Sequence, residues 1–308
     1  MRNRLLVAAA CAVALLAAGC AGGRAGAPAA GDRRLLRVVA TTTQVQDFAR
    51  VLGGDRVLVT GILRPNVDPH DYEPSPADLD AIARADVLVE NGVGLERWLD
   101  DTIRSAGFKG VRVDASRGVR LRHSAEDPGE ADPHIWQNPR NAKVMCANIE
   151  RALAGADPAA ASRYRANLRA YDAQLDALDA SVAAQLAGLA DKRLVTNHDA
   201  FGYYADRYGL RLVGSVIPSF DTSAQLSARS IQQLVARIRA TGVRAIFAES
   251  SLPPKTAEAV GAQAGVRVVE GEGALYGDSL GPAGSDADTY LKMIRHNTRT
   301  IVAALSGT

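Results

Sequence analysis

The sequence has few of the residue types that define several common protein classes. Its 308 residues include three cysteines, five histidines and only 5% aromatic residues. Three cysteines without a C-x-x-C spacing exclude a disulfide-rich scaffold, a zinc knuckle and a redox motif. Cys146 lies in a helical pattern, where we expect a buried thiol. The formal net charge is +2, and Arg2 and Arg4 account for it, so nucleic-acid binding is not expected.

One long apolar run is present, at the N-terminus. Leu5–Ala18 follows the basic residues Met1–Arg4 and is shorter than the roughly 20 residues of a membrane span. This pattern predicts a signal peptide at residues 1–19. The small residues before Cys20 resemble the lipobox of bacterial lipoproteins, which implies that Cys20 is lipidated and anchors the chain to a membrane. Residues 20–35 would then be the lipidated cysteine and a flexible tether; the alternative is a soluble secreted protein.

After the tether, short apolar strands alternate with helical patterns, which predicts mostly parallel β-sheets. The first series has strands at 37–41, 57–63, 86–90 and 111–114, with helices at 45–52, from Ser75, and at 95–105. After a helix at 141–153 and a long one described next, the second series has strands at 193–197, 210–217, 244–249 and 266–269. Its helices cover residues near 203, 227–241, 254–264 and, at the end, 286–305.

Between the two series, apolar residues recur every three or four positions from Tyr164 to Leu189. Such a stripe predicts one helix of roughly 30 residues, or about 45 Å. We therefore expect an α/β protein with two similar lobes, each with a mostly parallel central sheet. The N-terminal lobe spans 36–156, the linker helix 157–190 and the C-terminal lobe 191–308.

Three of the five histidines follow predicted strands. His70 and His134 each end an Asp-Pro-His tripeptide, and His198 follows the strand that begins the second series. Loops at the carboxyl ends of parallel strands commonly bind ligands, and neutral imidazoles bind divalent transition metals. A fourth ligand is expected, and Glu249 and Asp278 are the carboxylates at strand ends in the second series. We expect His123, in a polar loop, and His296, in the last helix, to be solvated.

The three strand-end histidines and Asp278 lie in four segments: Pro65–Pro74, Asp132–Pro139, Thr196–Leu210, and Gly277–Ser279 followed by Tyr290–Met293. In this order the segments resemble the metal motifs of the TroA/ZnuA-like family, the cluster A-I solute-binding proteins of bacterial zinc and manganese ABC transporters. The resemblance covers roughly residues 37–305. It implies metal ligation by His70, His134, His198 and Asp278 in the cleft between the lobes. Glu249 is then expected to hold one of the imidazoles in place.

Histidine as the third ligand resembles the zinc-type or mixed members of the family, whereas manganese-type members often have glutamate there. Three nitrogens and one carboxylate suit Zn²⁺, which also binds such sites more tightly than Mn²⁺. We expect Zn²⁺ as the cargo, with Mn²⁺ as the alternative. The His-rich loop of many zinc members is absent, since residues 115–133 contain one histidine.

The expected function is capture of this metal at the outer face of the cytoplasmic membrane and delivery to an ABC permease with its ATPase. We expect a monomer without catalytic activity and with modest motion between the lobes. A zinc hydrolase is the alternative from another class, but the chain has no H-E-x-x-H motif and a fourth protein ligand would exclude a catalytic water. An additional adhesin role stays open. Binding by neutral imidazoles predicts weaker affinity as the pH falls through about 6.5.

Overall fold

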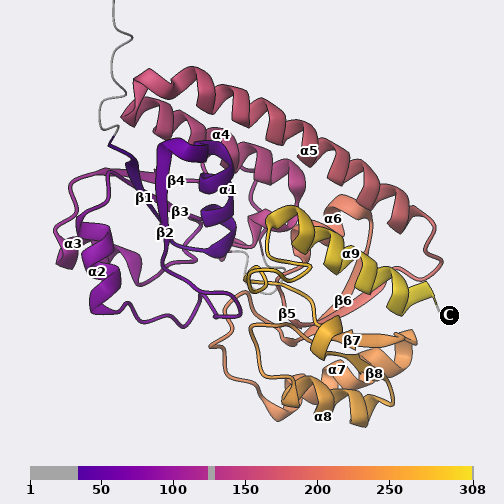
Figure 1. The fold of residues 1–308 in the computed structure, drawn as a ribbon. Coiled ribbons are helices and arrows are strands. Elements are labelled where there is room, and N and C mark those ends of the chain that lie inside the picture. The colour runs from indigo at the N-terminus through magenta and orange to yellow at the C-terminus, as the bar shows by residue number, and fades with distance from the viewer. Residues whose placement is uncertain (1–33, 124–128, 307–308) are drawn as a thin grey trace, which may run out of the picture. The chain divides into compact units, whose positions relative to one another are not determined.

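The computed structural model describes residues 34–123 and 129–306, and the fold is described for these residues (Figure 1). The signal peptide predicted at 1–19 and the predicted lipidation site Cys20 lie outside them. Among the described helices, none combines the length and apolarity that a membrane crossing needs.

The first lobe is built around a four-stranded parallel sheet in the order β2-β1-β3-β4. Its elements are β1 (Leu36–Ala40), α1 (Thr43–Gly53), β2 (Val57–Gly61), α2 (Pro76–Ala83), β3 (Val87–Glu90), α3 (Leu99–Ala106), β4 (Val111–Asp114) and α4 (Pro139–Ala156). Val38 of the central strand pairs with Val59 on one side and Val87 on the other. The buried side chains of this sheet pack against α1 and α4, which form its apolar core.

The second lobe repeats this architecture with a parallel sheet in the order β6-β5-β7-β8. Its elements are β5 (Arg193–His198), α6 (Gly202–Tyr208), β6 (Arg211–Ile217), α7 (Ala228–Thr241), β7 (Ala245–Phe247), α8 (Lys255–Ala264), β8 (Arg267–Val269) and α9 (Tyr290–Ser306). In both sheets the strand order switches sides at the first strand: the second strand lies on one side of it, and the third and fourth lie on the other. The carboxyl ends of the strands at such a switch point are a typical position for ligand sites. The prediction of two similar α/β lobes is confirmed.

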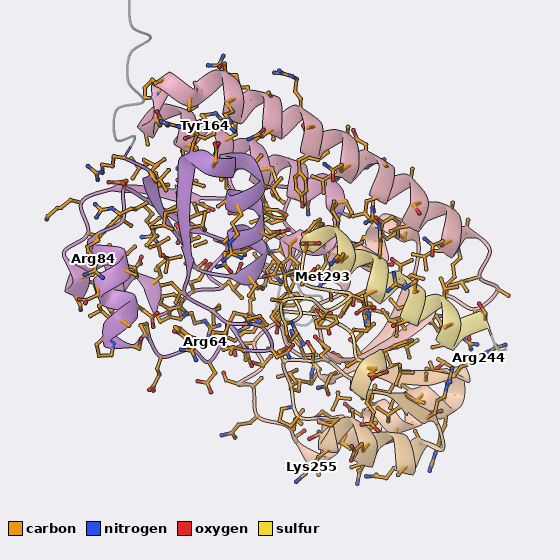
Figure 2. All side chains as sticks on the ribbon, in the orientation of Figure 1. Arg64, Arg84, Tyr164, Arg244, Lys255 and Met293 are labelled. Carbon is orange, nitrogen blue, oxygen red and sulfur yellow. The ribbon has the colours of Figure 1, made fainter. Side chains whose placement is uncertain are left out.

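One long helix, α5 (Ala161–Ala187), runs along both lobes (Figure 1). It packs on α1 and α4 of the first lobe and on α6 and α9 of the second. The predicted stripe forms its inner face, with Tyr164, Leu175 and Leu186 fully buried. Figure 2 shows that charged and apolar side chains are separated in the rest of the protein as well. Arg84 and Lys255 lie at the periphery, whereas Met293 of α9 lies in the interior.

Local sequence determines where several helices begin. Ser75 and Asp78 form the predicted capping box of α2, with Pro76 as its first residue.

Two predicted helix starts are wrong. The helix expected from residue 95 begins at Leu99, and the Glu96 carboxylate before it instead binds the backbone N–H groups of Asn91 and Gly92. The last helix, expected from Asp286, begins at Tyr290, whose backbone N–H is bound by another part of the chain.

Candidate metal centre

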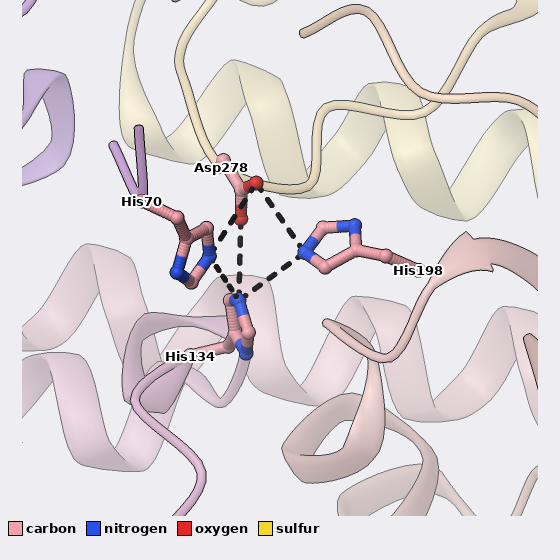
Figure 3. Close-up of side chains that lie close together, drawn as sticks. All are labelled: His70, His134, His198 and Asp278. Carbon is pink, nitrogen blue, oxygen red and sulfur yellow. Dashed lines mark hydrogen bonds and ion pairs between the residues drawn. The ribbon is translucent and has the colours of Figure 1, made fainter. Parts of the chain in front are cut away.

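Three imidazoles and one carboxylate meet between the two sheets (Figure 3). One donor atom each of His70, His134, His198 and Asp278 lies within 4.8 Å of the others. The Nε2 atoms of His70 and His198 both lie 3.3 Å from Nε2 of His134. The carboxylate oxygens of Asp278 lie 3.3 Å from Nε2 of His134 and of His198. We call these four residues the His3Asp cluster.

The four residues lie at the carboxyl ends of strands or in the segments that follow them. His70 lies between β2 and α2, and His134 follows β4 just before α4. His198 is the last residue of β5, and Asp278 lies between β8 and α9. The parallel topology therefore brings together residues that are far apart in the sequence.

The cluster is buried and its carboxylate has no ordinary partner. His134 and His198 are fully buried, Asp278 is 2% exposed, and the side chain of His70 is 6% exposed. Within the described residues, neither carboxylate oxygen of Asp278 accepts a hydrogen bond from a backbone or amide donor. A buried carboxylate is costly without a compensating charge. A divalent cation bound by the three Nε2 atoms and this carboxylate would supply that charge, so the residues fit a metal ion.

Two further carboxylates orient two of the imidazoles. Asp132 Oδ1 accepts hydrogen bonds from the backbone N of His134 at 3.0 Å and from its ring Nδ1 at 2.8 Å. Glu249 Oε1 contacts the backbone N and ring Nδ1 of His198 at the same two distances. A proton on Nδ1 leaves Nε2 free to ligate, and it fixes the direction in which Nε2 points. Glu249 therefore lies against the ring of His198, on the side away from Asp278.

Sequence reasoning missed the role of Asp132. The available signal was its position two residues before His134 in Asp-Pro-His, since an aspartate readily accepts from the backbone N–H two residues later. Asp68 makes that backbone contact with His70 at 2.9 Å. Its second oxygen, however, accepts from Thr222 rather than approaching the His70 ring. The tripeptide therefore predicts the backbone contact but not the ring contact.

The three imidazoles differ in how readily they carry a positive charge. Burial lowers the pKa of His70 to about 3. Burial also opposes protonation of His134, but the carboxylates of Asp132 and Asp278, on either side of its ring, outweigh it and raise its pKa to about 9. The pKa of His198 is raised as well, because the charges of Asp278 and Glu249 outweigh the effect of burial. Although Asp278 is buried, the neighbouring imidazoles hold its pKa well below the ordinary value.

The first lobe holds the loop that carries Asp278. Gln44 Nε2 donates to the backbone oxygen of Asp278 at 3.0 Å. Trp136 Nε1 and Gln137 Nε2 donate to the backbone oxygen of Gly277 at 3.0 and 2.8 Å. Gly277 must lack a side chain here, since a Cβ atom would lie 1.8 Å from Glu249 Oε2. Residues from three segments of the chain thus determine where the Asp278 loop lies.

The other two histidines lie outside the cluster. His123 is exposed, as predicted, and its backbone forms a bridge with Ala131. The prediction that His296 is solvated is wrong, because it is only 5% exposed. Its Nδ1 lies 2.9 Å from Asp286 and its Nε2 lies 3.0 Å from the backbone oxygen of Ala274. His296 lies on the inner face of α9, against the segment that leads to Asp278. Cys146 is buried with a free thiol, as predicted.

Comparison with known proteins identifies relatives that match nearly the whole chain. The family model described as zinc-uptake complex component A, periplasmic, matches residues 38–304. The manganese-binding lipoprotein MntA of Bacillus subtilis is 33% identical over 277 residues, which are 88% of this chain and 90% of MntA. The zinc-binding protein TroA of Treponema pallidum is 34% identical over 284 residues, which are 90% of this chain and 91% of TroA.

A third relative and a solved structure agree with these matches. The iron ABC transporter substrate-binding lipoprotein MtsA of Streptococcus pyogenes is 29% identical, with 88% of this chain and 89% of MtsA covered. The solved structure of the periplasmic zinc-binding protein TroA superimposes with a TM-score of 0.81 at 30% identity. That alignment covers 88% of this chain and 99% of the TroA chain.

Proposed function

The chain belongs to the family of periplasmic zinc-uptake complex component A proteins, and from this premise we propose that it delivers a divalent transition metal to an ABC permease and its ATPase. The observation that carries the proposal is the buried Asp278 carboxylate, which faces three imidazole Nε2 atoms instead of hydrogen-bond donors. The similarity to MntA, TroA and MtsA supports a transport role, since their names describe metal-binding proteins and, for MtsA, an ABC transporter component.

His70, His134, His198 and Asp278 are the proposed ligands. Asp132 and Glu249 keep two of the imidazoles in the tautomer that ligates through Nε2. We propose Zn²⁺ as the cargo, because three nitrogens and one carboxylate match its preferred donors and it exceeds Mn²⁺ in the Irving–Williams order. Mn²⁺ is the alternative, since one of the relatives is named for manganese.

The ligand set supports binding rather than catalysis. Catalytic zinc sites in proteins typically have three protein ligands and an open position for water, whereas four protein ligands complete a tetrahedral site. We therefore propose that the chain is a carrier and not a hydrolase, and we further propose that it acts as a monomer. It works outside the cytoplasm, held at the outer face of the cytoplasmic membrane by a lipid on Cys20.

Native mass spectrometry with elemental analysis tests this proposal. The chain without its first 19 residues is stripped of metal and then offered equal concentrations of Zn²⁺ and Mn²⁺. We expect one Zn²⁺ per chain, lost on His198→Ala and retained on His123→Ala, which removes an exposed imidazole instead. Preferential retention of Mn²⁺ would overturn the choice of cargo. Absence of any bound metal would overturn the carrier function.

The lipid anchor requires a separate test. We expect the full-length chain expressed in a bacterium to fractionate with membranes and to incorporate labelled fatty acid. Cys20→Ser should abolish both, and Cys146→Ser should abolish neither because that thiol is buried in the first lobe. Fractionation of the Cys20→Ser chain with membranes would contradict anchoring at Cys20.

A further inference from the structure

Arg122 connects a residue of the His3Asp cluster to the second lobe. Its Nη1 donates to Asp132 Oδ2 at 2.6 Å, and its Nε donates to Asp206 Oδ2 at 2.6 Å. The other oxygen of Asp132 accepts from the ring and backbone of His134. Asp206 belongs to α6 of the second lobe. A continuous series of charged hydrogen bonds therefore runs from α6 through Arg122 and Asp132 to His134.

The guanidinium is fixed in this position by its packing on α6. The backbone N of Arg122 donates to the Tyr203 hydroxyl, which in turn donates to the backbone oxygen of Asp132, both at 3.0 Å. The guanidinium carbon lies 5.6 Å from the centre of the Tyr203 ring. A Cβ atom on Gly202 would lie 1.6 Å from Nη1, so the first residue of α6 leaves room for the guanidinium only because it is glycine.

The second oriented imidazole has no such connection. Glu249 Oε1 holds His198, but within the described residues its Oε2 is buried without a hydrogen-bond partner. Asp132 therefore has both oxygens restrained, one by His134 and one by Arg122, whereas Glu249 has one. The two carboxylate–imidazole pairs are alike in distance but differ in how firmly the carboxylate is held.

We infer that Arg122 is a positioning residue, which aims the His134 imidazole at the metal according to the placement of α6 in the second lobe. The inference rests on the proposed function and adds a means by which contact between the lobes controls ligand geometry. A guanidinium that acted only as a charge would have the opposite effect, because a positive charge near a cation site repels the cation. Removal of Arg122 therefore distinguishes the two roles: metal affinity should fall if Arg122 positions His134, and it should rise if Arg122 acts only as a positive charge.

The test uses Co²⁺, whose visible absorption reports the geometry of its ligands. Arg122 contacts Asp132 and not the imidazole itself, so we expect Arg122→Gln to weaken Co²⁺ binding by up to about 10-fold, the lower end of the 10- to 100-fold typical for loss of a direct outer partner. Its Co²⁺ absorption bands should shift as well. Arg122→Lys keeps the charge but lacks the planar fork that reaches two carboxylates, so it should rescue binding only in part. Arg120→Gln, which removes a neighbouring exposed arginine, is the matched control and should change neither quantity.

Asp206→Asn tests the connection between Arg122 and the second lobe. It also provides a second test of the inference if Arg122→Gln does not fold. It leaves the contact between Arg122 and Asp132 in place, so a smaller loss of affinity with a shifted spectrum is expected. Unchanged affinity and spectrum in folded Arg122→Gln, even with a lower melting temperature, would overturn the inference, and so would tighter binding. If the unaltered chain bound no Co²⁺, Zn²⁺ or Mn²⁺, the proposed function itself would fail.

Discussion

Asp47 is a buried carboxylate whose replacement by asparagine should stabilise the metal-free protein at neutral and alkaline pH. It lies on α1 and is 9% exposed. Its Oδ2 accepts a hydrogen bond of 2.9 Å from the backbone N of Tyr290, the first residue of α9. Burial raises the pKa of Asp47 from 3.8 to about 6, although the Tyr290 hydrogen bond and the charge of Arg50 act in the opposite direction.

The sign follows from proton linkage. Between the unfolded value of 3.8 and the folded value of about 6, the native state binds a proton that the unfolded state has lost. The free energy of unfolding therefore falls as the pH rises through this interval. Two pKa units correspond to about 3 kcal/mol. Asparagine retains an oxygen for the Tyr290 N–H but removes the anion at the start of α9, which costs about 0.3–1 kcal/mol. We expect a net gain of about 2 kcal/mol at pH 8.

Urea unfolding at pH 8, 6 and 4 measures this effect. The chain is stripped of metal first, because a bound ligand adds its own stabilisation. Asp47→Asn should raise the midpoint at pH 8, and the gain should be nearly lost at pH 4, where the folded carboxyl is protonated and the unfolded one is about half protonated. Asp80→Asn, at a side chain that is 71% exposed, is the control and should change stability by less than about 0.5 kcal/mol. Lower stability of Asp47→Asn at pH 8, or an equal gain at pH 4, would refute the reasoning.

Three other predictions concern the cluster and the linker helix. Because the pKa values of His134, about 9, and of His198 are both raised, protons must leave before the two Nε2 atoms ligate, so metal affinity should still rise at least about tenfold per pH unit between pH 7 and 8.5. Competition with a chelator measures this, and an affinity that levels off above about pH 6.5, the value of an ordinary imidazole, would contradict it. Glu249→Gln should weaken metal binding by about 10- to 100-fold in the same assay, and unchanged affinity would show that His198 needs no carboxylate. Asp179 of α5 accepts two hydrogen bonds from Arg207 of α6, so Asp179→Asn should lower the free energy of urea unfolding by about 2–3 kcal/mol; an unchanged midpoint would contradict this.

The sequence predicts the fold well because the signals for it are local. Alternating strand and helix patterns and the stripe on α5 depend on residues within one segment. Two of the errors, at the start of α9 and at His296, occur where a distant group decides. The start of α9 depends on Asp47 of α1, which binds the N–H of Tyr290. The burial of His296 depends on the segment around Ala274, whose backbone oxygen it contacts. Neither partner is near its target in the sequence.

The residues of the candidate site also differ in whether local sequence identifies them. Strand-end positions alone singled out the three imidazoles but left Glu249 and Asp278 as equal candidates for the fourth ligand, and only the family resemblance separated them. The structure gives a physical distinction: Glu249 faces the Nδ1 side of His198, whereas Asp278 faces the Nε2 side. Whether a carboxylate approaches the inner or the outer nitrogen of an imidazole depends on tertiary packing, which spacing along the chain does not encode.

The position of Asp278 also changes how the two lobes share the cluster. By chain order, two cluster residues belong to each lobe. The hydrogen bonds attach the Asp278 loop to both lobes: its backbone is bound by Gln44 on α1 and by Trp136 and Gln137 before α4, whereas Tyr276, two residues earlier, is bound by Asn297 of α9. If the two sheets separated with the bonds to the first lobe intact and those at Tyr276 broken, only His198, which lies on β5 and is held by Glu249, would be withdrawn. His70, His134 and Asp278 would stay together as a three-donor site. A metal that loses one of four ligands is bound more weakly but is not released outright. We therefore expect the metal affinity to depend on the distance between His198 and the other three donors.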